Sequence, residues 1–332
     1  MKATFKTVLS VVLSYLMVIS VLPLSVLSTS AADNDIQGEG TQDSPYRIYS
    51  AEDFVYAMGE YGTNENVWLS LENDIDISGL YQLIADFKAH LNGNYHSIIS
   101  TTGIANNSTG VITSLCYYNN GSAAYTTYNG AYGGLVGRNQ GIISNTIVSV
   151  EITEGSRGAI ICGANSGSII NCAAFGSVNL YNEDGATAAG IAVTSIGTIA
   201  NCYVVASVSA SGSSRYGVSC SQPISFGTYE NSFFDSSICL YDYPGGYSTE
   251  VMKSSDFIDL LNTDIKTLDS LWRTDSANIN NGYPVLAPAY NAKIRCSKTN
   301  TLIQGTETIE LLLTMMQKYA LLQMAANQMH LL

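Results

Sequence analysis

The sequence is short of charged side chains, and basic ones are the scarcest. Lysine and arginine together number 14 against 27 aspartates and glutamates, and charged residues make up only 12% of the chain. The formal net charge is −13 at pH 7. An acidic surface of this kind repels phosphate backbones and anionic lipid headgroups. We therefore expect no nucleic-acid partner and no binding to anionic membranes.

The motifs of common hydrolases are also missing. The three histidines, His90, His96 and His330, form no HExxH zinc motif, and no GxSxG elbow presents a serine nucleophile. No lysine occurs between Lys88 and Lys253, where a β-helical polysaccharide lyase would need a base. Carboxylates are present by type, but none falls in a pattern that identifies the acid pair of a glycosidase. We predict no catalytic residue and no cofactor, and we expect His96 to be a turn residue that bonds the backbone.

One segment partly matches a calcium-binding loop. Residues 74–79 (DIDISG) copy its first half, with aspartates at the first and third positions. The twelfth position is Ala85 rather than glutamate, so the bidentate ligand is missing. We predict no metal site here, and a strand that ends in a turn.

The first 32 residues have the pattern of an export signal. Lys2 and Lys6 precede an apolar run over residues 8–27, and the small residues Ser30, Ala31 and Ala32 fit a cleavage site. Several serines and Pro23 interrupt the run, which favours a cleaved signal over a membrane anchor. We expect a secreted or cell-surface protein whose only membrane contact would be an uncleaved signal.

Four segments further along repeat one phrase, a glycine followed four residues later by an asparagine. The phrases GRNQGIISN, GANSGSIIN, TSIGTIAN and SFGTYEN end at intervals of 26, 30 and 30 residues, at Asn145, Asn171, Asn201 and Asn231. Short β-branched runs without helical period lie between them. The pattern predicts an all-β parallel β-solenoid with three short strands per turn. In-register stacking would align the four asparagines as a ladder of side-chain amides.

The cysteines favour free thiols over a disulfide framework. All seven follow the signal segment, and an odd number cannot pair completely within the chain. Cys172 and Cys202 occupy the same phase of the repeat, one residue after the asparagine, where Ser232 stands in the next unit. We predict that the two thiols stack as small buried side chains.

Composition divides the chain into five parts. Ser50 and Asp53 predict a capped helix before the first coil, and a helical pattern over residues 251–261 with Trp272 predicts a cap that covers the last coil. The predicted parts are a signal segment (1–32), an N-terminal cap with the first coil (33–100), the repeats (101–245), a C-terminal cap (246–290) and an atypical tail, helical or disordered (291–332).

The repeats resemble those of exported bacterial proteins with GLUG motifs, named for a Gly-Leu-hydrophobic-Gly signature. Residues 134–141 (GLVGRNQG) match it fully, and residues 160–167 keep its second half. The flanks at residues 43–48 and 281–286 also resemble the family's usual opening and close. Residues 91–98 (LNGNYHSI) resemble its Leu-Asp-Gly-Asn-Gly-His-Thr-Ile turn, although Asn92 and Tyr95 stand where the family has Asp and Gly. The resemblance implies a right-handed, pectin-lyase-like parallel β-helix at the bacterial surface, in adhesins or beside the protease domain of IgA-cleaving enzymes, without catalysis of its own.

Two groups of residues are candidates for ligand binding. Charges of the repeats gather in variable loops after the asparagines, where solenoids commonly bind partners, although solvated ion pairs would give the same pattern. Tyrosines in residues 116–132 could grip a sugar by stacking, or could cover a loop insertion. The candidates are Glu154, Arg157, Glu183, Asp184 and Arg215 in the first group, and Tyr125 and Tyr128 in the second.

The predicted function is that of a non-catalytic module that adheres to or binds a glycan or an extracellular protein. An extracellular carbohydrate-active β-helix enzyme, either glycosidase or lyase, is the alternative from another class. A third interpretation is a structural spacer within a larger surface protein.

Overall fold

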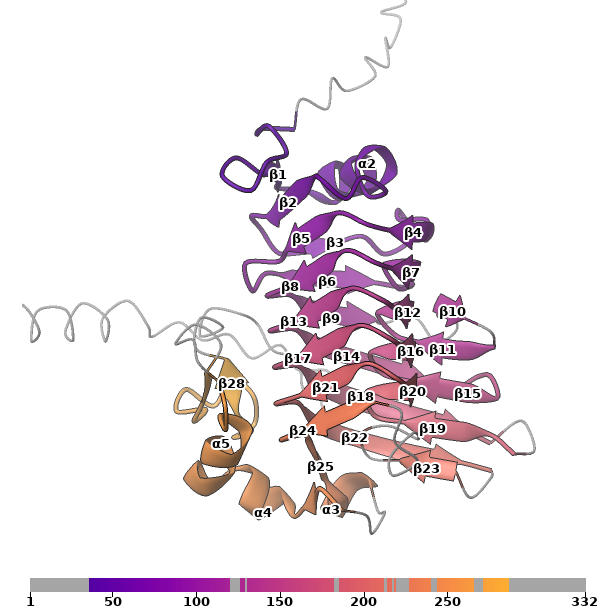
Figure 1. Ribbon diagram of the computed structural model, residues 1–332, viewed down its shortest axis with the longest axis vertical. Helices are drawn as coiled ribbons and strands as arrows, with labels where there is room; N and C mark the ends of the chain where they lie inside the picture. Colours follow the sequence, from indigo (N-terminus) through magenta and orange to yellow (C-terminus); the bar gives the residue numbers. More distant parts are fainter. Residues whose placement is uncertain are drawn as a thin grey trace, which may run out of the picture. The chain divides into compact units, whose positions relative to one another are not determined.

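The repeats form a parallel β-helix (Figure 1), as their spacing predicts. The computed structural model describes residues 36–119, 126–128, 130–181, 185–211, 214–216, 218, 227–239, 244–265 and 271–286. The predicted signal segment and the tail from residue 291 lie outside these ranges. In the described ranges no helix combines the length and the apolarity that crossing a bilayer requires.

Two eight-stranded sheets run the length of the stack. Sheet A contains, in stacking order, β1 (Tyr46–Ile48), β2 (Trp68–Leu71), β5 (His90–Asn92), β8 (Val111–Thr113), β13 (Ile142–Ser144), β17 (Ser168–Ile170), β21 (Thr198–Ala200) and β24 (Thr228–Glu230). Sheet B contains β3 (Ile75–Asp76), β6 (Ser97–Ser100), β9 (Cys116–Asn119), β14 (Ile147–Ile152), β18 (Ala173–Leu180), β22 (Tyr203–Ala210), β25 (Phe233–Asp235) and β26 (Gly246–Tyr247).

Two five-stranded sheets complete the coils. Sheet C contains β4 (Ile84–Phe87), β7 (Ala105–Ser108), β12 (Val136–Asn139), β16 (Cys162–Asn165) and β20 (Ala192–Ser195). Sheet D contains β10 (Thr126–Tyr128), β11 (Ala131–Gly133), β15 (Arg157–Ala159), β19 (Thr187–Ala189) and β23 (Ser214–Tyr216). The coils that begin at β11, β15 and β19 therefore have four strands rather than the predicted three, because the segment after β9, β14 or β18 returns as a strand of sheet D.

The interior is a set of in-register apolar columns. On sheet A the middle residue of each three-residue strand from β5 to β21 points inward, and Leu91, Ile112 and Ile143 pair in sequence with neighbours above and below. All three are fully buried, as are Ile169 and Ile199 in the next two coils. Because alternate residues of a strand face opposite sides, the flanking residues lie on the outer face of the sheet.

The repeated glycines allow successive coils to touch. A Cβ atom on Gly167 would lie 2.1 Å from the backbone oxygen of Gly141, and one on Gly197 would lie 2.0 Å from that of Gly167. Gly141 has the same relation to Gly110, also at 2.0 Å. No side chain fits at this corner, so the glycine half of the phrase is a requirement of stacking.

The repeated asparagines make a tight turn between sheets A and B. All four have φ between 44° and 54°, in the left-handed region that asparagine tolerates better than most residues. Asn171 Nδ2 donates to Asn145 Oδ1 at 3.2 Å, which confirms the amide ladder for this pair. The ladder does not continue. Asn201 and Asn231 donate instead to backbone oxygens of residues 261 and 263, which cover the corner in the later coils.

A second amide ladder lies inside the stack and was not predicted. Asn139 Nδ2 donates to Asn165 Oδ1 at 2.9 Å, and Asn165 Nδ2 donates to Ser195 Oγ at 3.0 Å. All three residues are buried. All three end a strand of sheet C. Asn139 and Asn165 also donate to the backbone oxygens of Ser168 and Thr198, which begin the sheet A strands of the next coils.

The predicted thiol ladder is present and has a specific bonding role. Cys172 N–H donates to Cys202 Sγ at 3.3 Å, and Cys202 N–H donates to Ser232 Oγ at 3.2 Å. Each of these side chains also donates to the backbone oxygen two residues before it. Burial, and then the hydrogen bond to Cys202, raises the pKa of Cys172 well above the usual thiol range, so the Cys172 thiol stays protonated.

This ladder predicts a contrast between two substitutions of Cys202. Cys202→Ser retains a group that accepts the Cys172 N–H, so we expect a change in unfolding free energy within about 1 kcal/mol. Cys202→Ala leaves that buried N–H without a partner and should cost about 1–3 kcal/mol. Chemical denaturation followed by circular dichroism checks both. Equal losses for the two variants would show that thiol volume, not hydrogen bonding, matters.

The N-terminal end of the stack is closed by α2 (Ala51–Glu60), as predicted. Ser50 Oγ accepts from Asp53 N at 3.1 Å, and Asp53 Oδ2 accepts from Ser50 N at 3.0 Å, which completes a capping box. Phe54, Ala57 and Met58 are fully buried against the first coil. The helix thus covers the apolar cross-section that the coil would otherwise expose.

The C-terminal segment differs from its predicted placement. The short helix α3 (Ser236–Cys239) follows the last coil, and Cys239 joins the interior core there. After β26, residues 248–265 and 271–286, which we name the C-terminal module, pack instead against the outer side of sheet B. This module contains α4 (Thr249–Met252), α5 (Ser255–Leu261), β27 (Trp272–Arg273) and β28 (Val285–Leu286), and it lies beside the stack in Figure 1.

Aromatic contacts fix this lateral position. Trp272 is 1% exposed, lies 4.9 Å from Tyr203 between ring centroids, and donates from Nε1 to Asn201 O at 2.9 Å. Tyr283 OH donates to Asp235 Oδ2 at 2.6 Å. The predicted cap was misplaced because outward side chains of sheet B, such as Phe175 and Tyr203, are themselves apolar and are buried by the C-terminal module.

Candidate functional site

The variable loops of successive coils emerge at one corner, between sheets B and D. They connect β14 to β15, β18 to β19 and β22 to β23, and we name their described residues, 153–157, 181, 185–186, 211 and 214–215, the loop edge. Continuous parallel pairing within sheets B and D holds these connections one above the other. The predicted clustering of the insertions on one side of the solenoid is therefore a property of the backbone.

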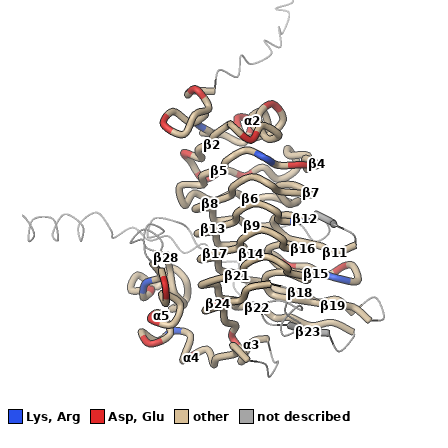
Figure 2. The backbone as a smooth tube through the Cα atoms, in the orientation of Figure 1, with Lys and Arg blue, Asp and Glu red and all other residues tan. Residues whose placement is uncertain are grey.

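Two of the five predicted charged residues belong to the connection between β14 and β15. Glu154 is exposed in the β14–β15 connection, and Arg157 begins β15 half-buried. No ion pair joins these two charges to each other or to other residues in the described ranges. Figure 2 shows acidic and basic segments in the loop before β15.

The β14–β15 loop is held in shape by a neighbouring ring. Gly155 has φ +96°, and a Cβ atom there would lie 2.2 Å from the Tyr132 ring, so the ring packs directly on the glycine. Tyr132 thus supports the segment between Glu154 and Arg157. The charges on either side of Gly155 are carried by a loop with a fixed backbone turn.

The other charged candidates are only partly located. Glu183 and Asp184 fall outside the described residues. Arg215 lies in β23, where it pairs with Ala188, whereas Arg157 pairs with Thr187. The two arginines thus belong to adjacent columns of sheet D rather than to one column. The structure describes the backbone of Arg215 but not its side chain.

The tyrosine-rich segment divides between interior and surface. Tyr117 is fully buried, and its hydroxyl donates to Thr102 O, while Tyr118 is 4% exposed under the C-terminal module. Tyr125 and the side chain of Tyr128 lie outside the described residues, although the backbone of Tyr128 is part of β10. The first two tyrosines of the segment are therefore core residues.

One aromatic residue of the loop edge was missed by the sequence reasoning. Tyr181 directly follows β18 and is 64% exposed, among the most exposed large apolar side chains described. It adjoins the segment that holds Glu183 and Asp184. The sequence signal for this exposure is that Tyr181 directly follows the long strand β18, where the alternation of inward and outward side chains ends.

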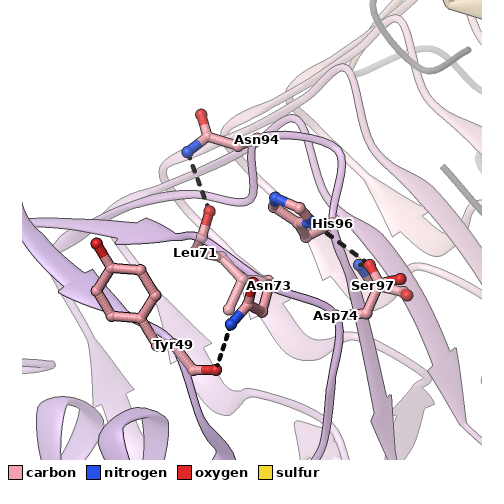
Figure 3. Close-up of polar contacts among 7 residues, drawn as sticks. All are labelled: Tyr49, Leu71, Asn73, Asp74, Asn94, His96 and Ser97. Carbon is pink, nitrogen blue, oxygen red and sulfur yellow. Dashed lines mark hydrogen bonds and ion pairs between the residues drawn. The ribbon is translucent and has the colours of Figure 1, made fainter. Parts of the chain in front are cut away.

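A second polar group lies near the N-terminal end, at the corner between sheets A and B (Figure 3). His96 Nδ1 lies 3.4 Å from Asp74 Oδ1, which also accepts from Ser97 N at 2.9 Å. Asn94 Nδ2 donates to Leu71 O, and Asn73 Nδ2 donates to Tyr49 O, both at 3.0 Å. The backbone N–H of His96 bonds Gly93 O as a turn residue should, but its side chain faces an acid rather than the backbone.

The partial calcium loop is occupied by the protein's own donors. Asp74 receives Ser97 N–H, and Asp76 Oδ1 accepts from Ser78 N at 2.9 Å. Across the described residues no group of three or more histidine, cysteine, aspartate or glutamate side chains is placed to hold a metal ion. These contacts give the local acids a role in closing turns.

Comparison with known proteins supports the fold but does not identify a function. No family model matches the chain, and no curated protein matches it. Among solved structures, the chain is similar to the crystal structure of a putative immunoglobulin A1 protease from Bacteroides ovatus. The TM-score is 0.56 at 18% sequence identity, over 76% of this chain and 94% of the other. At this identity the likeness concerns architecture alone.

Proposed function

We propose that the chain is a non-catalytic β-helix module, secreted from or displayed on a bacterial cell, that binds a glycan or an extracellular protein through its loop edge. The observation that carries the proposal is the pair Glu154 and Arg157, which bear opposite charges at one corner without an ion pair between them. Charges that are not neutralised within the protein remain available to a ligand.

The arrangement of the loop edge supports this function. Exposed Tyr181 supplies an aromatic surface in the coil that follows Glu154 and Arg157. Two sheets hold both loops in register, so little conformational entropy is lost when a ligand binds. A rigid scaffold with polar and aromatic groups at one corner is typical of solenoid binding surfaces.

The test compares two triple variants in a binding screen. Glu154→Gln, Arg157→Gln and Tyr181→Ala remove the described groups of the loop edge, whereas Glu250→Gln, Arg273→Gln and Tyr49→Ala change the same residue types at exposed positions elsewhere. Against a glycan array and a panel of matrix proteins, we expect the first variant to bind its ligand at least about 10-fold more weakly. The second variant should bind like the unaltered protein.

Two results would contradict the proposal. If every ligand found in the screen still bound the loop-edge variant, the loop edge would have no part in binding. Depolymerisation of a polysaccharide, or cleavage of immunoglobulin A1, by the purified protein would support an enzyme instead. The screen therefore includes polysaccharide and immunoglobulin substrates with product detection.

A further inference from the structure

The outer face of sheet A carries two parallel columns of different chemistry. One column pairs Trp68 with His90, then continues through Val111 and Ile142 in the next two coils. The other column, two residues along each strand, contains Ser70, Asn92, Thr113 and Ser144. From β2 to β13 an apolar stripe thus lies beside a stripe of hydroxyl and amide groups. In the next two coils the pattern reverses, with Ser168 and Thr198 in the first column and Ile170 and Ala200 in the second.

The apolar column is accessible and contains an aromatic pair. Ile142 is 43% exposed, and Trp68, His90 and Val111 are half-buried. The Trp68 and His90 rings stack with centroids 4.0 Å apart and planes 6° from parallel. His90 Nδ1 is buried without a hydrogen-bond partner among the described residues, and buried polar atoms of this kind are rare.

The polar column retains hydrogen-bonding capacity. Ser144 Oγ donates to Thr113 Oγ1 at 2.9 Å, so two hydroxyl groups of neighbouring coils form a chain. Asn92 Oδ1 accepts from Asn94 N at 3.0 Å, and the Asn92 amide nitrogen has no partner among the described residues. Ser70 is 5% exposed and already bonds Glu72 and Asn94. The accessible donors and acceptors of this column therefore lie between β5 and β13, at the spacing of the strands, about 4.8 Å.

The face is neutral on a protein that is otherwise acidic. From β2 to β21 neither outer column contains lysine, arginine, aspartate or glutamate, and charge returns only at Arg47 in β1 and Glu230 in β24. Sheet A is drawn without charge along β8, β13, β17 and β21 in Figure 2. An uncharged ligand matches this surface, whereas an anionic polymer would meet the negative charge of the whole protein.

We propose that this face binds an extended, uncharged polysaccharide that lies along the stack axis. A sugar ring has an apolar C–H face and hydroxyl groups at its edge, which match the two columns. Sugar rings of an extended chain recur at nearly the interval of the strands, so one coil would contact about one sugar. The inference rests on the proposed binding function but assigns it a second surface, distinct from the loop edge.

The test uses affinity electrophoresis of the full chain without its predicted signal segment. Gels contain hydroxyethyl cellulose, galactomannan or arabinoxylan as neutral probes, and polygalacturonate as an anionic control. We expect retardation by at least one neutral polymer and none by polygalacturonate. Ile142→Glu places a charge on the face at an exposed position and should weaken retardation at least 10-fold, whereas Ile196→Glu, at a 64% exposed site in a turn off the face, should not.

A spectroscopic measurement locates the contact independently. The chain has two tryptophans, and Trp272 is buried, so a Trp272→Phe variant reports Trp68 alone. Soluble oligosaccharides of the retarding polymer should shift or quench its emission. The proposal would be overturned if Ile142→Glu did not weaken retardation, or if only the loop-edge variant abolished it. Either result would leave the proposed function standing. Failure of every neutral polymer, or self-association that Ile142→Glu disrupts, would also overturn it.

Discussion

Replacement of Gly167 by alanine should unfold the stack, with a loss of at least about 4 kcal/mol of unfolding free energy. The added Cβ atom would lie 2.1 Å from the backbone oxygen of Gly141. Both atoms are attached to backbone that pairs with coils above and below, so neither can move away cheaply. Loss of the cooperative transition in chemical denaturation, followed by circular dichroism, would show this effect.

Gly59 provides the matched control for this substitution. It lies in α2, and a Cβ atom there would meet no heavy atom within 4 Å. Gly59→Ala should therefore stabilise the protein by about 0.5–1 kcal/mol, the usual gain from replacing glycine within a helix. If Gly167→Ala were as stable as Gly59→Ala, the coils would have to be further apart at this corner than the structure shows.

Replacement of Trp272 by alanine should detach the C-terminal module from sheet B. Trp272 is 1% exposed, packs on Tyr203 and bonds Asn201 O, so the variant should lose about 3–5 kcal/mol of local stability. Hydrogen exchange should show that the backbone amides of the C-terminal module lose their protection. Protection of the inward residues of sheet A should remain, because no residue of that sheet belongs to the apolar cluster around Trp272.

Trp272→Phe separates packing from hydrogen bonding at the same site. The smaller ring keeps most of the apolar contact but loses the Nε1 donor to Asn201 O, so we expect about 1–2 kcal/mol. Unfolding of the whole stack in Trp272→Ala would show that the module is needed for the coils themselves. That outcome would contradict an independent role for the module.

Local patterns predicted the features that repeat within one coil. The asparagine of each phrase marks a left-handed turn, and the residue after it is a small donor and acceptor, as in Cys172 and Cys202. Ser50 and Asp53 identified the first helix because a capping box needs only four residues of context. Features of this kind depend on short-range geometry, which the sequence shows directly.

The loop edge was only partly predictable. Its backbone follows from the variable intervals between phrases, and the structure places Glu154, Arg157 and Arg215 in or next to these connections. The fourth strand of each coil was not foreseen, because three residues such as Arg157–Ala159 carry too little pattern to identify a strand. The exposure of Tyr181 also had to come from the structure.

By itself the sequence determined that this chain is a stack of similar coils, where each coil turns and which side chains alternate inward. Only the tertiary structure decided which outer faces are covered. Phe175 and Tyr203 on sheet B, and Trp68 and Ile142 on sheet A, are all outward apolar side chains of short strands. The first two are fully buried because the C-terminal module packs over them, whereas Ile142 remains 43% exposed. That choice depends on contacts between segments tens of residues apart, and no local spacing records it.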